Sequence, residues 1–255
     1  LVATDAIGMG INMDINNVSF NNLKKFDGKK TRKLYLNEIS QIAGRAGRHI
    51  NDGTFGITGE CDQLSAGEIE KLEKHELERI NLLYWRNPNI SFDSLELLIN
   101  SLEEKTNNEF LKRINECEDE KVLKFLIKDD EDIRKKLDKS FIKTLWECCQ
   151  IPDFSKKAYG NHIEVVKKVF GFLSSKTGRV TNEYMKKQLE YLDKYDGNID
   201  TLSNRISNVR TWSYVSNKRN WVDNSDYWIE RTKYIEDKLS DNLHQELTKS
   251  FVDKR

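Results

Sequence analysis

The sequence predicts a short α/β segment followed by a mainly α-helical region. Short apolar runs flanked by glycine or asparagine, typical of buried strands, occur within residues 1–64. Beyond residue 65 apolar side chains recur at helical spacing, and only two of the 255 residues are proline. We therefore expect an α/β segment over residues 1–64, a connecting helix over 65–90 and a helical domain over 91–255.

The α/β segment contains two clear strand candidates. Residues 18–20 (VSF) and 53–59 (GTFGITG) are predicted to be strands of one half-sheet. Residues 1–3 resemble the end of another buried strand, which places Thr4 and Asp5 at a carboxyl edge, where open α/β sheets bind ligands. Next, a capping box formed by Ser65 and Glu68 opens a helix expected to run to about residue 85.

Helical periodicity dominates the remainder of the chain. We expect Trp212 to be a core anchor, because an apolar stripe lies on the same predicted helix. The acidic run 129–132 is predicted to be a solvated helix junction, because an isolated acidic run lacks the shaped cage that a cation needs. The predicted helices include residues 95–102, 110–114, 122–126, 141–150, 165–170 and 235–251, the last with a seam that packs within the helical domain.

Two motifs carry the candidate chemistry, residues 3–12 (ATDAIGMGIN) and 41–48 (QIAGRAGR). Phosphoryl transfer spreads negative charge over γ-phosphate oxygens, which planar guanidinium groups stabilise. We expect Arg45 and Arg48 to lie on one helix start, whose free N–H groups also favour an anion. Either motif alone also fits a plain turn or a basic helix start, whereas both in this order favour a nucleotide site.

With these motifs, the chain resembles the superfamily 2 RNA helicases at their motifs V and VI. More narrowly it resembles the Suv-three-type helicases of mitochondria and alphaproteobacteria. This second resemblance also rests on KFDG at 25–28, on DTLSNRISNVRTWSYVSNKRNW at 200–221, and on the C-terminal stretch 235–255. It implies that residues 1–64 are half of a second RecA-like domain, and that the whole protein is an ATP-dependent RNA helicase.

The resemblance also implies roles for individual residues. Gly10 and Asn12 would face the nucleotide ribose. Gln41 would link the nucleotide to the RNA side, while Arg45 and Arg48 would reach the γ-phosphate, Arg48 as the arginine finger. The chain has no GxxxxGK[ST] phosphate loop and no acidic magnesium-binding strand. We therefore expect magnesium to bind with ATP in an upstream domain, and this segment to be inactive alone.

RNA contacts must depend on local patches, because Lys+Arg and Asp+Glu balance at 42 each. The resemblance places Thr4 and Asp5 by the RNA backbone. For the basic cluster around Lys24 and Lys25 the sequence leaves phosphate contact and simple solvation open. The same two interpretations hold for the loop residues Lys218 and Arg219.

Further expectations concern metals, partners and location. Four cysteines without paired spacing suit neither a disulfide framework nor a zinc site, and no apolar run is long enough to span a membrane. The resemblance implies 3′-to-5′ unwinding in RNA turnover, possible action with an exoribonuclease, and location in the bacterial cytoplasm or, alternatively, the mitochondrial matrix. A DNA helicase on the same motor and an inactive RNA- or protein-binding scaffold are the alternative functions.

Overall fold

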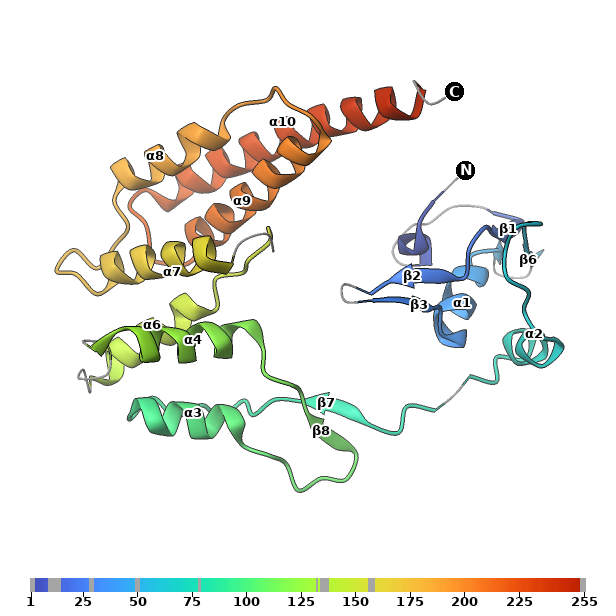
Figure 1. The fold of residues 1–255 in the computed structure, drawn as a ribbon, viewed down its shortest axis with the longest axis horizontal. Helices are drawn as coiled ribbons and strands as arrows, with labels where there is room; N and C mark the ends of the chain where they lie inside the picture. Colours follow the sequence, from blue (N-terminus) through green and yellow to red (C-terminus); the bar gives the residue numbers. More distant parts are fainter. Residues whose placement is uncertain are drawn as a thin grey trace. The chain divides into compact units, whose positions relative to one another are not determined.

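In the computed structural model of this chain the described residues are 3–8, 15–27, 30–48, 51–77, 79–131, 133, 138–155 and 159–252. The chain divides into two compact units, Leu1–Asn81 (unit 1) and Leu82–Arg255 (unit 2). Figure 1 shows short strands and helices in the blue part of the chain and longer helices from green to red. The prediction of an α/β segment followed by a mainly helical region is confirmed.

Unit 1 contains both predicted strands, as β1 and β6. They pair in parallel, with Val18 opposite Phe55. The two strands are separated by 33 residues of chain, 21–53. The strands β2 and β3 form an antiparallel hairpin, in which Lys25 lies opposite Arg32. The elements of this unit are the 3-10 helix η1 (Asp5–Gly8), β1 (Asn17–Phe20), β2 (Lys24–Phe26), β3 (Thr31–Lys33), α1 (Leu36–Ala43), β4 (Gly47–Arg48), β5 (Asn51–Asp52), β6 (Thr54–Ile57) and α2 (Ala66–Glu73).

Helix α2 begins where the sequence predicted but ends much earlier. The Ser65 hydroxyl caps it by accepting a hydrogen bond from the Glu68 backbone N–H. In turn, the Glu68 carboxylate accepts one from the Ser65 backbone N–H at 2.8 Å. The expectation that this helix continues to about residue 85 is wrong. His75 adopts φ of 54°, and the Glu76 N–H bonds the Lys71 carbonyl, a Schellman termination that normally uses glycine.

Unit 2 is built mainly from helices, as expected. The predicted helices near residues 95–102, 122–126, 141–150 and 165–170 are all present. The described elements are β7 (Leu83–Trp85), α3 (Leu95–Glu103), β8 (Leu111–Arg113), α4 (Glu118–Asp129), α6 (Lys139–Cys149), α7 (Tyr159–Leu173), α8 (Asn182–Leu192), α9 (Ile199–Asn217) and α10 (Ser225–Val252).

The helix expected over residues 110–114 is a strand instead. β8 pairs in parallel with β7, through bonds from the Leu83 N–H to the Phe110 carbonyl and from the Ile114 N–H to the Trp85 carbonyl. Three apolar side chains at 110, 111 and 114 do not distinguish a helix from a strand by their spacing. The pairing with β7 therefore decides that this segment is a strand.

The core of unit 2 confirms the predicted tryptophan anchor, because Trp212 is only 4% exposed. The seam of α10 is buried at Ile235 and Leu239 but partly exposed at Leu247. Its final seam position, Phe251, has a side chain outside the described part. No helix in the described ranges combines the length and apolar character required to cross a lipid bilayer.

Candidate functional site

The two candidate motifs meet inside unit 1. The Ile15 backbone forms a parallel bridge with Ala46, and the Gly47 N–H bonds the Ile15 carbonyl at 2.7 Å. The first motif itself is contacted at Gly8, whose carbonyl accepts a hydrogen bond from the Arg45 guanidinium. The structure therefore brings the segment after the first motif and the glycine-arginine segment of the second side by side.

Helix α1 contains the first three residues of the second motif, 41–43. Its apolar face buries Ile39 and Ile42 in the core of unit 1, while Gln41 is exposed. An added Cβ on Gly8 would lie 3.3 Å from the Ile42 side chain, so the 3-10 helix packs closely on α1. Glycine at this position allows the close packing, because a side chain there would press against Ile42.

The prediction that Arg45 and Arg48 share one helix is wrong. α1 ends at Ala43, with Gly44 as its C-cap, and Arg45 lies in the turn that follows. The last turn tightens, because the Arg45 N–H bonds the Ile42 carbonyl. Both arginines therefore follow a helix C-terminus, where the free backbone groups are carbonyl oxygens that repel an anion, so the argument from the helix start does not apply.

Arg48 lies on β4, which forms a tight antiparallel pair with β5. Gly47 has φ of 81°, and a Cβ there would lie 2.5 Å from the Asn51 carbonyl oxygen. Glycine is therefore required at Gly47, since an L side chain would be both strained and blocked. The Arg48 side chain is outside the described part, as are Gly10 and Asn12 entirely. Their predicted nucleotide contacts stay predictions.

The donor set of this site suits an anion. Arg45 is partly buried and Gln41 is exposed, while the carboxylates of Asp5 and Glu38, toward the other end of α1, are already bound by basic side chains. Such a set fits a phosphate better than a magnesium ion, which needs free carboxylate oxygens.

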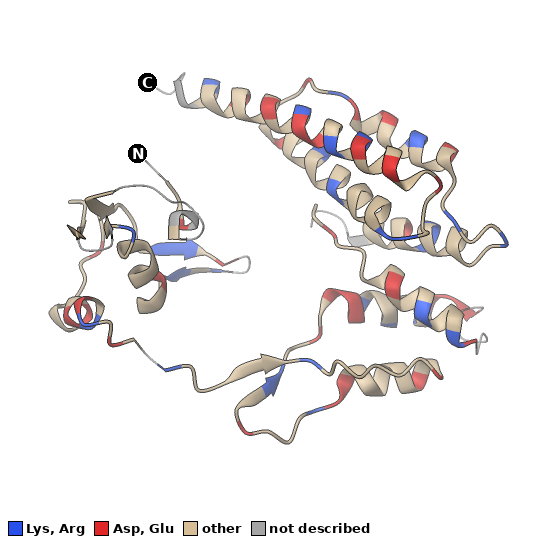
Figure 2. Cartoon of the chain, turned by 180° about the vertical axis from the view of Figure 1, so that it is seen from behind, with Lys and Arg blue, Asp and Glu red and all other residues tan. Residues whose placement is uncertain are grey.

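The basic hairpin is heavily ion-paired, which the sequence did not reveal. Figure 2 shows blue basic residues along both of its strands. The Lys24 ammonium lies 2.9 Å from an Asp62 oxygen, and the Lys25 ammonium lies 3.1 Å from Asp5 and 2.7 Å from Glu38. These partners come from distant parts of the chain, so no local charge spacing could have identified them. Direct RNA contact by the two lysines stays a prediction.

Glu38 is the centre of this charge network. It accepts two bonds from the Arg32 guanidinium, at 2.8 and 3.0 Å, and one from the Tyr35 N–H at 2.8 Å. The bonds from Arg32, together with those from Lys25 and Tyr35, lower the pKa of Glu38 to about 2 despite partial burial. The carboxylate is therefore ionised at any physiological pH, and it is held by four donors.

The second candidate RNA segment lies in unit 2. The Lys218 ammonium lies 5.0 Å from the Tyr214 ring centre and 5.8 Å from that of Trp221. Trp221 itself is buried, so it serves the core and does not offer a ring for base stacking. Arg219 is exposed in the following turn. The structure leaves phosphate contact by these two basic residues as a prediction.

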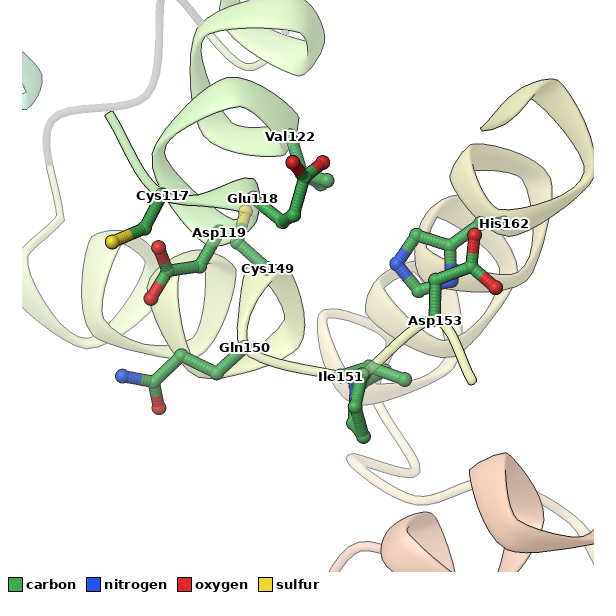
Figure 3. Close-up of a pocket in the computed structure, with 10 residues that line it drawn as sticks. Cys117, Glu118, Asp119, Val122, Cys149, Gln150, Ile151, Asp153 and His162 are labelled. Atoms are coloured by element: carbon green, nitrogen blue, oxygen red, sulfur yellow. The ribbon is translucent and has the colours of Figure 1, made fainter. Parts of the chain in front are cut away.

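A small cavity of about 230 Å³ in unit 2 collects polar groups that the sequence did not single out (Figure 3). Cys117 and Asp119 line it at the start of α4, and His162 points toward it from α7. Burial lowers the pKa of His162 and raises that of Cys117, which favours neutral forms of both. The cavity therefore offers little fixed charge beyond its carboxylates.

Two residues of the cavity wall, Cys117 and Asp119, also belong to a candidate metal cluster. Ligand atoms of Cys117, Asp119 and Glu120 lie within 4.8 Å of one another. However, Arg86 binds Asp119 at 2.8 Å and Arg113 binds Glu120 at 2.8 Å, which neutralises both carboxylates. Glu120 is 1% exposed, so this is a buried ion network that joins the strand pair to α4.

Comparison with known proteins identifies relatives of part of the chain. No family model matches it. The mitochondrial DExH-box ATP-dependent RNA helicase DExH16 of Arabidopsis thaliana is 60% identical over 48 residues, which are 19% of this chain and 8% of the relative. The mitochondrial ATP-dependent RNA helicase SUV3 of Oryza sativa subsp. japonica is 59% identical over 72 residues, 28% of this chain and 12% of the relative.

A longer alignment gives the same result. The mitochondrial DExH-box ATP-dependent RNA helicase DExH18 of Arabidopsis thaliana is 35% identical over 109 residues, 37% of this chain and 14% of the relative. The resemblance to Suv-three-type helicases is therefore confirmed over part of the chain. The matched stretches cover only 8%, 12% and 14% of the three relatives.

Proposed function

We propose that this chain is the C-terminal part of an ATP-dependent RNA helicase, and that unit 1 belongs to its second RecA-like motor domain. The observation that carries the proposal is the contact between the two motifs through Arg45 and the Gly8 carbonyl, supported by the bridge from Ile15, just after the first motif, to Ala46 in the second. The similarity to SUV3 and DExH helicases supports the same function.

On the nucleotide side, Arg45 and Arg48 stabilise the charge on the γ-phosphate, with Arg48 as the arginine finger. Gln41, exposed in the last turn of α1, links the nucleotide to the RNA side. Gly10 and Asn12 face the ribose. Magnesium bound with ATP would take its ligands from an upstream domain, because the Asp5 and Glu38 carboxylates are already occupied by basic side chains.

On the RNA side, Thr4 and Asp5 lie by the RNA backbone, and both are exposed on unit 1. Lys24 is available for a phosphate despite its partner, because an ion pair between exposed side chains is weak and exchanges readily. Lys218 and Arg219 provide a second basic contact on unit 2. Single-stranded RNA fits these contacts, because basic side chains bind backbone phosphates by charge and position and do not need to recognise the bases.

The proposed setting is RNA turnover, with 3′-to-5′ unwinding beside an exoribonuclease. The mitochondrial matrix is favoured over the bacterial cytoplasm, because the relatives DExH16, SUV3 and DExH18 carry mitochondrial names. Co-purification of an exoribonuclease with the complete protein is the measurement for the partner.

The test is strand displacement by the complete protein. We expect an RNA duplex with a 3′ overhang to be separated when ATP is present and to stay paired without it. A parallel DNA duplex distinguishes the DNA-helicase alternative, since phosphate contacts alone do not separate the two sugars. Tight RNA binding without ATP turnover would instead indicate the scaffold.

A further inference from the structure

The 3-10 helix η1 is held against α1 at both of its ends. At one end the Asp5 carboxylate accepts from the Lys25 ammonium at 3.1 Å, and the same ammonium lies 2.7 Å from Glu38 in the first turn of α1. At the other end the Gly8 carbonyl accepts from Arg45, just beyond the last turn of α1. Lys25 and Arg45 therefore fix the two segments at opposite ends of α1.

The two partners of Lys25 differ in how firmly they are held. Glu38 is bound by Arg32 and by the Tyr35 N–H as well as by Lys25, and its side chain is 21% exposed. Asp5 is 46% exposed, which makes its pair with Lys25 the weaker of the two. Lys25 thus makes one firm ion pair, with Glu38 on α1, and one weaker ion pair, with Asp5, that can exchange.

We propose that Lys25 is a positioning residue that couples RNA binding at Asp5 to the nucleotide-binding end of α1, through Glu38. This inference rests on the proposed function, which places Asp5 by RNA and Arg45 by the nucleotide. A displacement of η1 by RNA changes the Lys25 link at one end and the Arg45 link at the other. Both links end on or beside α1, the helix that carries Gln41.

The test compares two neutralising substitutions in the complete protein. Glu38→Gln removes the charge of the fixed partner of Lys25, and Asp62→Asn does the same for the partner of neighbouring Lys24, as the matched control. Three quantities are measured: ATP turnover without RNA, ATP turnover with saturating single-stranded RNA, and the RNA dissociation constant.

We expect Glu38→Gln to keep RNA-independent turnover and RNA affinity but to lower RNA-stimulated kcat at least fivefold, the lower end of typical coupling between sites. Asp62→Asn leaves all three quantities unchanged. Lys25→Met lowers RNA-stimulated kcat as Glu38→Gln does, and the double variant is no worse than either one, because both break the same link. Lys25→Arg restores stimulation.

Two results would overturn the coupling alone. One is normal RNA stimulation in Glu38→Gln; the other is additive losses with weakened RNA binding in Lys25→Met, which would make Lys25 a direct RNA contact. If the wild-type protein itself shows no RNA stimulation, the proposed function is wrong and the coupling falls with it. Unfolding midpoints of each variant separate these results from misfolding.

Discussion

Unit 1 and unit 2 differ in the size of their apolar cores. Among the described residues, seven buried apolar side chains form the core of unit 1 and thirty form that of unit 2. Unit 1 joins its short elements through ion pairs between distant residues, such as Lys25 with Asp5 and Lys33 with Glu68. The proposed chemistry lies in the unit with the smaller core, where charged contacts between exposed side chains can exchange when a ligand binds.

The largest effect is expected in unit 1, from removal of the proposed arginine finger. Arg48→Ala in the complete protein should lower ATP turnover about a thousandfold, the lower end for an arginine finger, and leave RNA affinity nearly unchanged. Steady-state ATPase assays measure it, with exposed Arg79→Ala as a charge-matched control. Turnover within a few fold of wild type would refute the finger assignment.

The large core of unit 2 predicts the next effect. Trp212→Ala should destabilise this unit by about 3–5 kcal/mol, because it leaves a cavity in the centre of a packed bundle. All five tryptophans lie beyond residue 81, so their fluorescence during urea unfolding reports unit 2 alone. Tyr191→Ala, at a side chain 70% exposed, is the control and should cost less than about 0.5 kcal/mol.

A smaller effect is expected at the helix cap of unit 1. Ser65→Ala removes the acceptor for the Glu68 N–H and should cost about 1 kcal/mol. Hydrogen exchange of the α2 amides measures it, and Ser65→Asp, which keeps a capping acceptor, should restore the protection. Equal protection in Ser65→Ala and wild type would show that the capping box does not stabilise α2.

The ion pairs of unit 1 predict a dependence on pH. The pKa of Glu38 is lowered to about 2, so its contribution to stability is complete above its ordinary pKa near 4.3 and is lost as the pH falls toward 2. Between about pH 4.5 and 2, amide protection in α1 should fall less steeply in Glu38→Gln than in wild type. Identical acid profiles would show that Glu38 is not stabilised by its donors.

Sequence reasoning succeeded where the signal was local or where a motif was specific. The strands at 17–20 and 54–57, the Ser65 cap and the Trp212 anchor all follow from patterns within a few residues. The two motifs also identified the helicase relatives before any comparison.

It failed where distant contacts or an unusual helix end decided the outcome. The strand β8 forms because β7 lies beside it, and α2 stops at a left-handed histidine in place of the usual glycine. The placement of Arg45 and Arg48 after α1, not within one helix, depends on the bridge between Ile15 and Ala46. Contacts of Lys25 with Asp5 and Glu38 have no signature in a single sequence.

ATP hydrolysis by the complete protein, with and without single-stranded RNA, tests the central claim most directly. We expect turnover that RNA strongly stimulates, because the proposed site of the two motifs joins the nucleotide to the RNA side. Tight RNA binding with no ATP turnover would contradict it and would make this chain part of an inactive scaffold.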